Sequence, residues 1–237
     1  MESSDLLFDP WHLREWLPLR HKGDVAFVPG RAKGNWEMEG SNKGIQFQGL
    51  LVVAAKVFHA HMVSAIVIPG TEGSRRGGTK TGPLVENGYP GKDVWTRELV
   101  NLGVPAASII PTRGEGYHTR SEIDDFIFLA KERGWMRGLV FMNPHETLRV
   151  MLSFLASRKE NEHAIDLFPV TPRASWDTLV YGSLGAQEMP RAHHILEEFL
   201  RVQKYQAAGH LASFDELGAY YNIVVGVPWP RWEETQH

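Results

Sequence analysis

The sequence predicts a single α/β domain, a three-layer α/β/α sandwich with a mainly parallel, Rossmann-like sheet. Short buried segments typical of strands alternate with segments of helical spacing, as a parallel sheet covered on both faces requires. Two expected strands, residues 24–30 and 64–70, end in the same Pro-Gly pair, which indicates a repeated turn where strands end. With 237 residues, the chain is long enough to bury a core without covalent staples.

Composition excludes several classes of site and partner. The chain has no cysteine, so disulfides, thiolate zinc sites, iron–sulfur clusters and cysteine nucleophiles are excluded. Its net charge is −3 and it has no long basic run, which argues against nucleic acid as a partner. No apolar run could span a membrane, and residues 1–20 lack the pattern of a signal peptide. We therefore expect a cytoplasmic protein without a membrane span.

The other expected elements follow in alternation. Strands are expected at residues 107–110, 138–142 and 164–170, and helices at 45–61, 92–102, 119–133, 145–157 and 190–206. The helix that begins at Thr119 has the clearest signals, because Thr119 and Glu122 match a capping box and Gly134 ends the apolar stripe.

The ends of the chain are expected to add helical parts to this core. Residues 1–20 are expected to form a helical extension, and residues 158–237 a C-terminal helical part. The helix at 190–206 is expected to bury one apolar stripe, made of Ile195, Leu196, Phe199 and Val202.

A long polar loop separates the second strand from the next helix. Residues 71–90 contain five glycines and the pair Arg75 and Arg76. Loops of about 20 residues are rarely plain connectors. We therefore expect this segment to form a mobile lid or the wall of a cleft.

Basic and glycine residues gather where the expected strands end. Ligands of open parallel sheets bind beyond the carboxyl ends of the strands, and Arg or Lys follows four of the five strands. Together with helix N-termini, such residues suit a phosphate, sulfate or carboxylate, although loops are often polar without a ligand. The ligand-binding candidates are Gly30, Arg31, Gly70, Thr71, Gly73, Arg75, Arg113, Gly114, His118, Thr119, Asn143 and Arg149.

Three side chains at the same edge are candidates for proton transfer. Glu72 and Glu115 follow neighbouring strands and could face each other as acid and base, in roles that depend on their separation. His145 stands at a helix start, where it is poised for proton transfer or is equally an ordinary surface residue. The sequence holds no GxxxxGK[ST] phosphate loop and no G-x-S-x-G nucleophile elbow.

A metal site is not predicted. His118 and Glu122 are four residues apart and could share a helix face, with a third ligand from another loop. The interpretation that we favour makes Glu122 the acid of the capping box and His118 a loop residue. No cofactor is indicated.

The motifs DVAFVPG, AIVIPGTEG, LVNLGVPAASII, GEGYHTRSEIDDF and GLVFMNPHETLRVML resemble those of the YdcF/SanA/ElyC-like family, a domain-of-unknown-function family. The resemblance covers residues 22–157 and implies a Rossmann-like fold that binds phosphorylated or nucleoside-type ligands, with a link to envelope polysaccharide metabolism. The chain departs from the family pattern at two places. Arg113 lies near the position of a usual glutamate, and His118 replaces an asparagine.

Two functions remain open from the sequence. The first is an enzyme that acts on a small anionic substrate by hydrolysis or group displacement, the substrate being a phosphate- or sulfate-bearing molecule, nucleotide-like ones included. Arg31, Arg75 and Arg113 would hold the anion. The alternative is a non-catalytic binding module for a nucleotide-like ligand or a protein partner, a homodimer included.

Overall fold

The core is one five-stranded, all-parallel sheet, which confirms the predicted Rossmann-like α/β class. The structure, a computed structural model, describes residues 23–32, 39–42, 45–76, 81–114, 116, 118–172, 176–182 and 187–225. The sheet strands are β1 (Val25–Phe27), β4 (Ile66–Ile68), β5 (Ile109–Pro111), β6 (Arg137–Phe141) and β7 (Asp166–Val170). The predicted extension at residues 1–20 lies outside the described residues.

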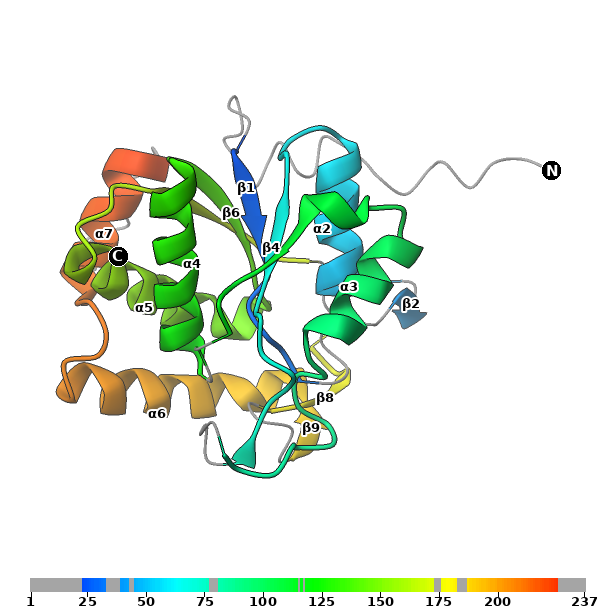
Figure 1. Cartoon of the computed structure of the whole chain (residues 1–237). Coiled ribbons are helices and arrows are strands. Elements are labelled where there is room, and N and C mark those ends of the chain that lie inside the picture. The colour runs from blue at the N-terminus through cyan, green and yellow to red at the C-terminus, as the bar shows by residue number, and fades with distance from the viewer. Residues whose placement is uncertain are drawn as a thin grey trace.

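Helices cover both faces of this sheet (Figure 1). On one face lie α2 (Leu50–His59) and α3 (Lys92–Asn101), and on the other lie α4 (Thr119–Arg133), α5 (Thr147–Glu160) and α7 (Phe214–Tyr220). Each face has its own apolar cluster, because successive strand residues point to opposite sides. Phe27 stacks on Phe126 of α4 in one cluster, with ring centroids 4.4 Å apart.

The strand order places a switch point between β1 and β6. The sheet order is β5-β4-β1-β6-β7, so the chain winds outward through β4 and β5 and then resumes on the other side of β1. Ala26 pairs with Ile66 of β4 on one side and with Leu139 of β6 on the other. The loops that leave β1 and β6 therefore diverge at their carboxyl ends, where open α/β sheets form their ligand crevices.

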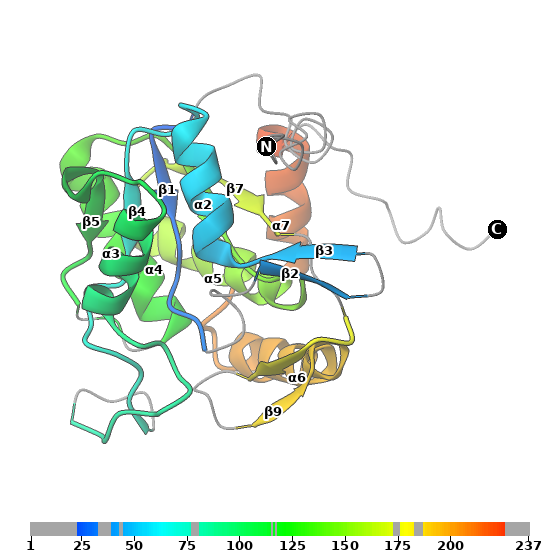
Figure 2. The same cartoon turned by 90° about the vertical axis from the view of Figure 1, so that its right-hand side faces the viewer.

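Short elements surround this frame. The antiparallel pairs are β2 (Glu39–Asn42) with β3 (Ile45–Gln48) and β8 (Leu179–Tyr181) with β9 (Glu188–Pro190). Single turns are η2 (Ala106–Ser108), η3 (Pro144–Glu146), η5 (Arg191–His193) and η6 (Tyr221–Val225). Figure 2 shows the β2–β3 ribbon beside the start of α2. The predicted helix at 45–61 therefore begins too early, because Ile45–Gln48 pairs as a strand and α2 starts at Leu50.

Helix α6 (His194–Ala207) crosses the molecule at the edge where the sheet strands end (Figures 1 and 2). Its inward face is largely polar, with His194, Glu198 and Val202 buried. Leu196 and Phe199 are 68% and 52% exposed, so the prediction that they point inward is wrong, whereas that for Val202 is confirmed. Apolar spacing misleads here because this helix packs on charged side chains.

The start of α4 also differs from its prediction. His118 is the N-cap: its Nδ1 accepts a bond from the Ser121 N–H, and the Ser121 hydroxyl oxygen accepts one from the His118 N–H, each at 3.2 Å. The predicted capping box of Thr119 and Glu122 is therefore wrong by one residue. Because His118 and Ser121 form the capping box, the Glu122 carboxylate does not cap this helix. None of the described helices is long and apolar enough to cross a bilayer.

Candidate active site at the strand ends

Buried polar side chains gather at the switch point between β1 and β6, beneath α6. We call this group the switch-point cluster, and its members are Arg31, Glu122, Asn143, Glu146, Arg149, Arg191, His194 and Glu198. Each of them is less than a tenth exposed. Arginine and glutamate are seldom fully buried without partners, so such a concentration requires a structural or chemical reason.

Arg31 and Asn143 meet at one oxygen of Glu146. The Arg31 Nε lies 2.7 Å from Glu146 Oε2, and the Asn143 Nδ2 donates to the same oxygen at 2.8 Å. The Arg31 Nη1 donates to the Gly30 carbonyl at 2.7 Å. The loops after β1 and β6 are therefore joined across the switch point by a single carboxylate.

Arg149, in the first turn of α5, links α6 to the start of α4. Its guanidinium pairs with the Glu198 carboxylate through Nε and Nη2, and its Nη1 donates to the Thr119 hydroxyl at 2.9 Å. Arg201 approaches the same Glu198 from the rim, at 2.5 Å. The first turns of α4 and α5 and the middle of α6 thus share one network of charged hydrogen bonds.

Glu122 faces the end of β1 across the switch point. Its Oε2 accepts a bond from the Gly30 N–H at 3.1 Å. Burial raises the pKa of Glu122 to about 7, although Arg31, the Gly30 N–H and Arg149 act in the opposite direction. A Cβ at position 30 would lie 2.8 Å from Glu122 Oε1 and 3.1 Å from the Tyr89 ring, so glycine permits this close approach.

Two neighbouring side chains, His145 and Glu146, each keep a single protonation state near neutral pH. Burial lowers the pKa of His145 to about 4, and its ring stacks on His194 with centroids 5.7 Å apart. Burial alone would raise the pKa of Glu146, but Arg31, His145 and Arg149 hold it at about 2. At pH 7 the cluster therefore combines a neutral imidazole, an ionised carboxylate and one carboxyl near its midpoint.

The loop after β4 reaches this cluster through Tyr89. Its hydroxyl donates to the Pro69 carbonyl at 2.8 Å, and its ring meets Trp95 edge-on. Burial and the nearby Glu122 raise the pKa of Tyr89 well above its usual value. Arg75 and Leu84 form a bridge within the same loop, and residues 77–80 lie outside the described residues. The described part of the loop thus packs beside the site, while its mobility stays a prediction.

Six of the predicted site residues come together at the cluster. They are Gly30, Arg31, Thr119, Asn143, His145 and Arg149. His118 stands at the start of α4 as its N-cap. Glu115 lies outside the described residues.

The other predicted residues make contacts within the loops after β4 and β5. Gly70 donates its N–H to the Thr112 hydroxyl, and the Thr71 carbonyl accepts from the Lys92 N–H. Gly73 and Gly114 both adopt positive φ angles, which suit glycine. The backbones at Gly70 and Gly114 pass so closely that a Cβ on Gly114 would lie 2.7 Å from the Gly70 carbonyl oxygen.

Arg113 and Glu72 point to other partners. The Arg113 guanidinium pairs with Glu132 of α4 at 3.0 Å and lies 3.3 Å above the Phe128 ring. Glu72 is largely exposed and lies 3.5 Å from Arg75. The structure therefore does not bring Arg113 or Glu72 into the switch-point cluster.

Sequence reasoning missed several members of the cluster. Glu146 stands beside the predicted His145 and could have been found from its place after a strand. Glu122 was given a capping role, and Tyr89 lay inside a long loop. Glu198, Arg191 and His194 come from a segment whose pattern gave no functional signal, because their role depends on where α6 crosses the sheet.

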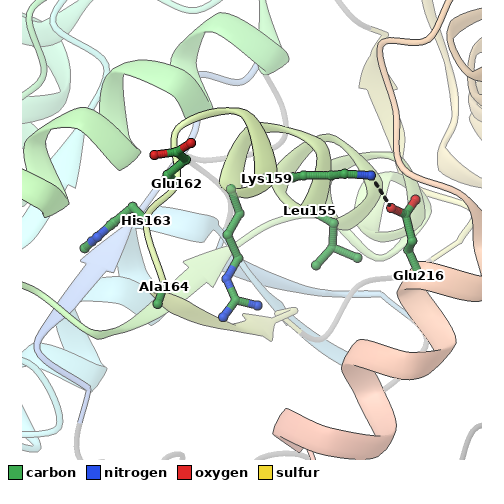
Figure 3. A pocket seen from close by; sticks show the side chains of 7 residues that line it. Leu155, Lys159, Glu162, His163, Ala164 and Glu216 are labelled. Carbon is green, nitrogen blue, oxygen red and sulfur yellow. Dashed lines mark hydrogen bonds and ion pairs between the residues drawn. The ribbon is translucent and has the colours of Figure 1, made fainter.

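A separate cavity of about 390 Å³ lies at the C-terminal end of α5, and Figure 3 shows the residues that line it. It is lined by the last turns of α5, the turn that follows and the start of α7. The Lys159 ammonium and the Glu216 carboxylate pair across it at 3.2 Å. Since α5 begins beside the strand ends and runs away from them, this cavity is not part of the candidate site.

The donor set of the cluster suits an anion better than a metal ion. Within the part of the chain that the structure describes, no group of three His, Asp or Glu side chains is placed to hold a metal. Arginine guanidinium and backbone N–H groups are instead the usual donors to phosphate, sulfate and carboxylate oxygens.

Comparison with protein-family models, curated proteins and solved structures finds no match to this chain. Membership of the YdcF/SanA/ElyC-like family therefore stays a prediction.

The raised pKa of Glu122 leads to a pH-dependent difference in stability. Between pH 4.5 and 7 the folded chain holds a proton at Glu122 that the unfolded chain has released, so this group lowers stability as pH rises. We expect Glu122→Gln to gain stability relative to the wild type across that window, by about 3 kcal/mol in total. Urea unfolding at half-unit pH steps measures the difference.

His145 acts with the opposite sign but is common to both proteins. Its pKa is lowered, so its contribution is lost as pH falls from 6.5 to about 4, and subtraction removes it. A constant difference between the two proteins from pH 4.5 to 7 would contradict the assigned environment of Glu122.

Proposed function

We propose that this protein is an enzyme that acts on a small anionic substrate, by hydrolysis or group displacement, at the switch-point cluster. The observation that carries the proposal is a buried arginine, Arg31, whose charge acts on a buried carboxyl near its titration midpoint, Glu122. Both lie where a parallel α/β sheet forms its ligand crevice. Strongly perturbed carboxyls beside a charged partner are more common at active sites than elsewhere.

The side chains divide into anion binding and proton transfer. Arg31 presents a planar guanidinium that matches two oxygens of an anion. In a hydrolysis, the ionised Glu122 would take a proton from water as the water oxygen bonds to the central atom. The bond to the leaving group breaks, and the same proton can pass to that group. A carboxyl that titrates near pH 7 suits both steps.

Arg31 and Arg113 offer a matched test of the anion site. We expect at least one of a panel of sulfate esters, phosphate monoesters and phosphate diesters to raise the melting temperature of the wild type, because a ligand that binds only the folded state stabilises it. Arg31→Lys keeps the charge beside Glu146 but loses the planar fork, so it should abolish that shift. Arg113→Lys, whose side chain pairs with Glu132, should keep it.

Two results would contradict this proposal. One is an anion-induced shift that survives in Arg31→Lys and disappears in Arg113→Lys. The other is the absence of any shift across the panel. If an ester binds in an Arg31-dependent way, its turnover is measured next. Turnover by the wild type that is lost in Glu122→Gln indicates an enzyme, and binding without turnover indicates a binding module.

A second candidate function is a binding module that docks a second copy of the chain through α6. The outer face of this helix exposes Leu196, Phe199 and Leu200 at helical spacing, and the adjacent Glu197 and Arg201 already pair with each other at 3.3 Å. A neutral apolar stripe suits a copy of itself better than a charged partner. Sedimentation should then show a dimer that Leu196→Glu dissociates and Met136→Glu does not, because the exposed Met136 precedes β6 at the opposite edge of the sheet.

A further inference from the structure

Several buried polar atoms in the switch-point cluster and on the neighbouring His145 have no hydrogen-bond partner among the described residues. Among them are the Arg31 Nη2, the Asn143 Oδ1 and the His145 Nδ1. Arg31 is 4% exposed and Asn143 only 1%. Buried groups of this kind are rarely left unmatched, because each loses its bonds to water without gaining another partner.

The unmatched donor and acceptor belong to side chains that share an anchor. Arg31 through its Nε and Asn143 through its Nδ2 both lie within 2.8 Å of Glu146 Oε2. In Arg31, the unmatched Nη2 is bonded to the same carbon as the Nε that contacts Glu146. In Asn143, the unmatched Oδ1 is bonded to the same carbon as the Nδ2 that contacts Glu146. A small molecule that contacts both atoms would accept a bond from Arg31 and donate one to Asn143.

The charges of the cluster set the charge of such a molecule. Among the described residues, the cluster and its rim carry the arginines Arg31, Arg149, Arg191 and Arg201 and the glutamates Glu122, Glu146, Glu197 and Glu198. Four charges of each sign cancel when Glu122 is ionised, and one positive charge remains when it is protonated. A single negative charge then restores neutrality, whereas a second would be buried without a counter-charge.

We infer that the ligand of the proposed site is a monoanionic ester, a phosphate diester or a sulfate monoester, that carries a hydroxyl next to its charged group. The anionic oxygens accept from Arg31, and the hydroxyl donates to Asn143, with His145 beside it as a further partner. A phosphate monoester, which is largely dianionic at neutral pH, fits this charge balance less well. The inference rests on the proposed function and narrows its substrate class.

Calorimetric titration at pH 6.5, where most of Glu122 is protonated, tests the inference with simple esters on the wild-type protein. We expect 2-hydroxyethyl sulfate to bind at least tenfold more tightly than ethyl sulfate, or glycerophosphoglycerol at least tenfold more tightly than diethyl phosphate. A site built to bond a hydroxyl discriminates strongly against an analogue that lacks it. A preference within the sulfate pair identifies the ligand as a sulfate ester, and a preference within the phosphate pair identifies it as a phosphate diester.

The variants separate this inference from the proposed function. Arg31→Lys should weaken the preferred ester at least tenfold, and Arg113→Lys should leave it unchanged. If glycerol 3-phosphate, a dianion, binds most tightly and depends on Arg31, the anion site stands and the monoanion inference is overturned. Equal binding of esters with and without the hydroxyl also overturns it. If no ester binds in an Arg31-dependent way, both the inference and the proposed function fail.

Discussion

Arg149→Met is expected to lower the free energy of unfolding by about 3 kcal/mol, because it removes one partner of a buried ion pair. Arg149 is 6% exposed and bonds Glu198, which is 5% exposed, as well as the Thr119 hydroxyl. Methionine keeps the volume of the stem but leaves the Glu198 carboxylate with only Arg201. Urea unfolding at pH 7 measures the loss.

Arg201→Met is the matched control, because it removes the other arginine that contacts the same carboxylate. Arg201 is on the rim, where solvent screens the pair, so this change should cost no more than about 1 kcal/mol. Equal losses in the two variants would show that burial of Arg149 does not set the strength of the pair. The attachment of α6 to the strand ends would then have to come from other contacts.

The elements that sequence reasoning placed correctly are those whose signals are local. The buried segments that became β1, β4 and β6 each end before small or turn-forming residues, and buried parallel strands produce such apolar runs directly. The alternation of strands and helices predicts a parallel sheet. The parallel sheet in turn predicts the edge at which Arg31 and Asn143 lie. That chain of inference needs no tertiary information, because each step depends on residues close together in the sequence.

What sequence reasoning could not place depends on contacts between distant segments. Glu122 accepts its bond from Gly30, 92 residues away, and nothing near Glu122 in the sequence distinguishes it from an ordinary capping acid. Glu198 lies on a helix with a regular apolar stripe, which predicts burial of Leu196 and Phe199. The structure instead exposes both of these side chains and buries Glu198, which pairs with Arg149. A buried charge network can therefore reverse the face that periodicity predicts.

The glycines show the same distinction between local and distant causes. The glycines that follow the strands are among the predicted ligand-binding residues. At Gly70 the N–H is already bonded to the Thr112 hydroxyl, and the close approach of two loops explains the residue. At Gly30 the approach is to Glu122, a member of the switch-point cluster, so here glycine serves the candidate site.

Gly70→Ala is expected to destabilise the fold by about 3 kcal/mol, through overpacking of two loops that cannot separate easily. A Cβ on residue 70 would lie 1.9 Å from the Thr112 carbonyl oxygen and 2.9 Å from the Gly114 N. Both obstacles are backbone atoms, so no side-chain rotation relieves them. The loops after β4 and β5 would have to move apart, breaking the bond from the Gly70 N–H to Thr112.

Gly23→Ala is the control for the loss of glycine flexibility in the unfolded chain. A Cβ there would meet its nearest atoms, on Leu139, Val63 and the Arg137 carbonyl, at 3.4 Å and beyond, which is ordinary contact, so stability should change by no more than about 0.5 kcal/mol. Thermal and urea unfolding of both variants measure the difference. A Gly70→Ala protein as stable as Gly23→Ala would mean that the strand-end loops yield readily, and glycine at position 70 would then need a reason other than packing, such as a ligand.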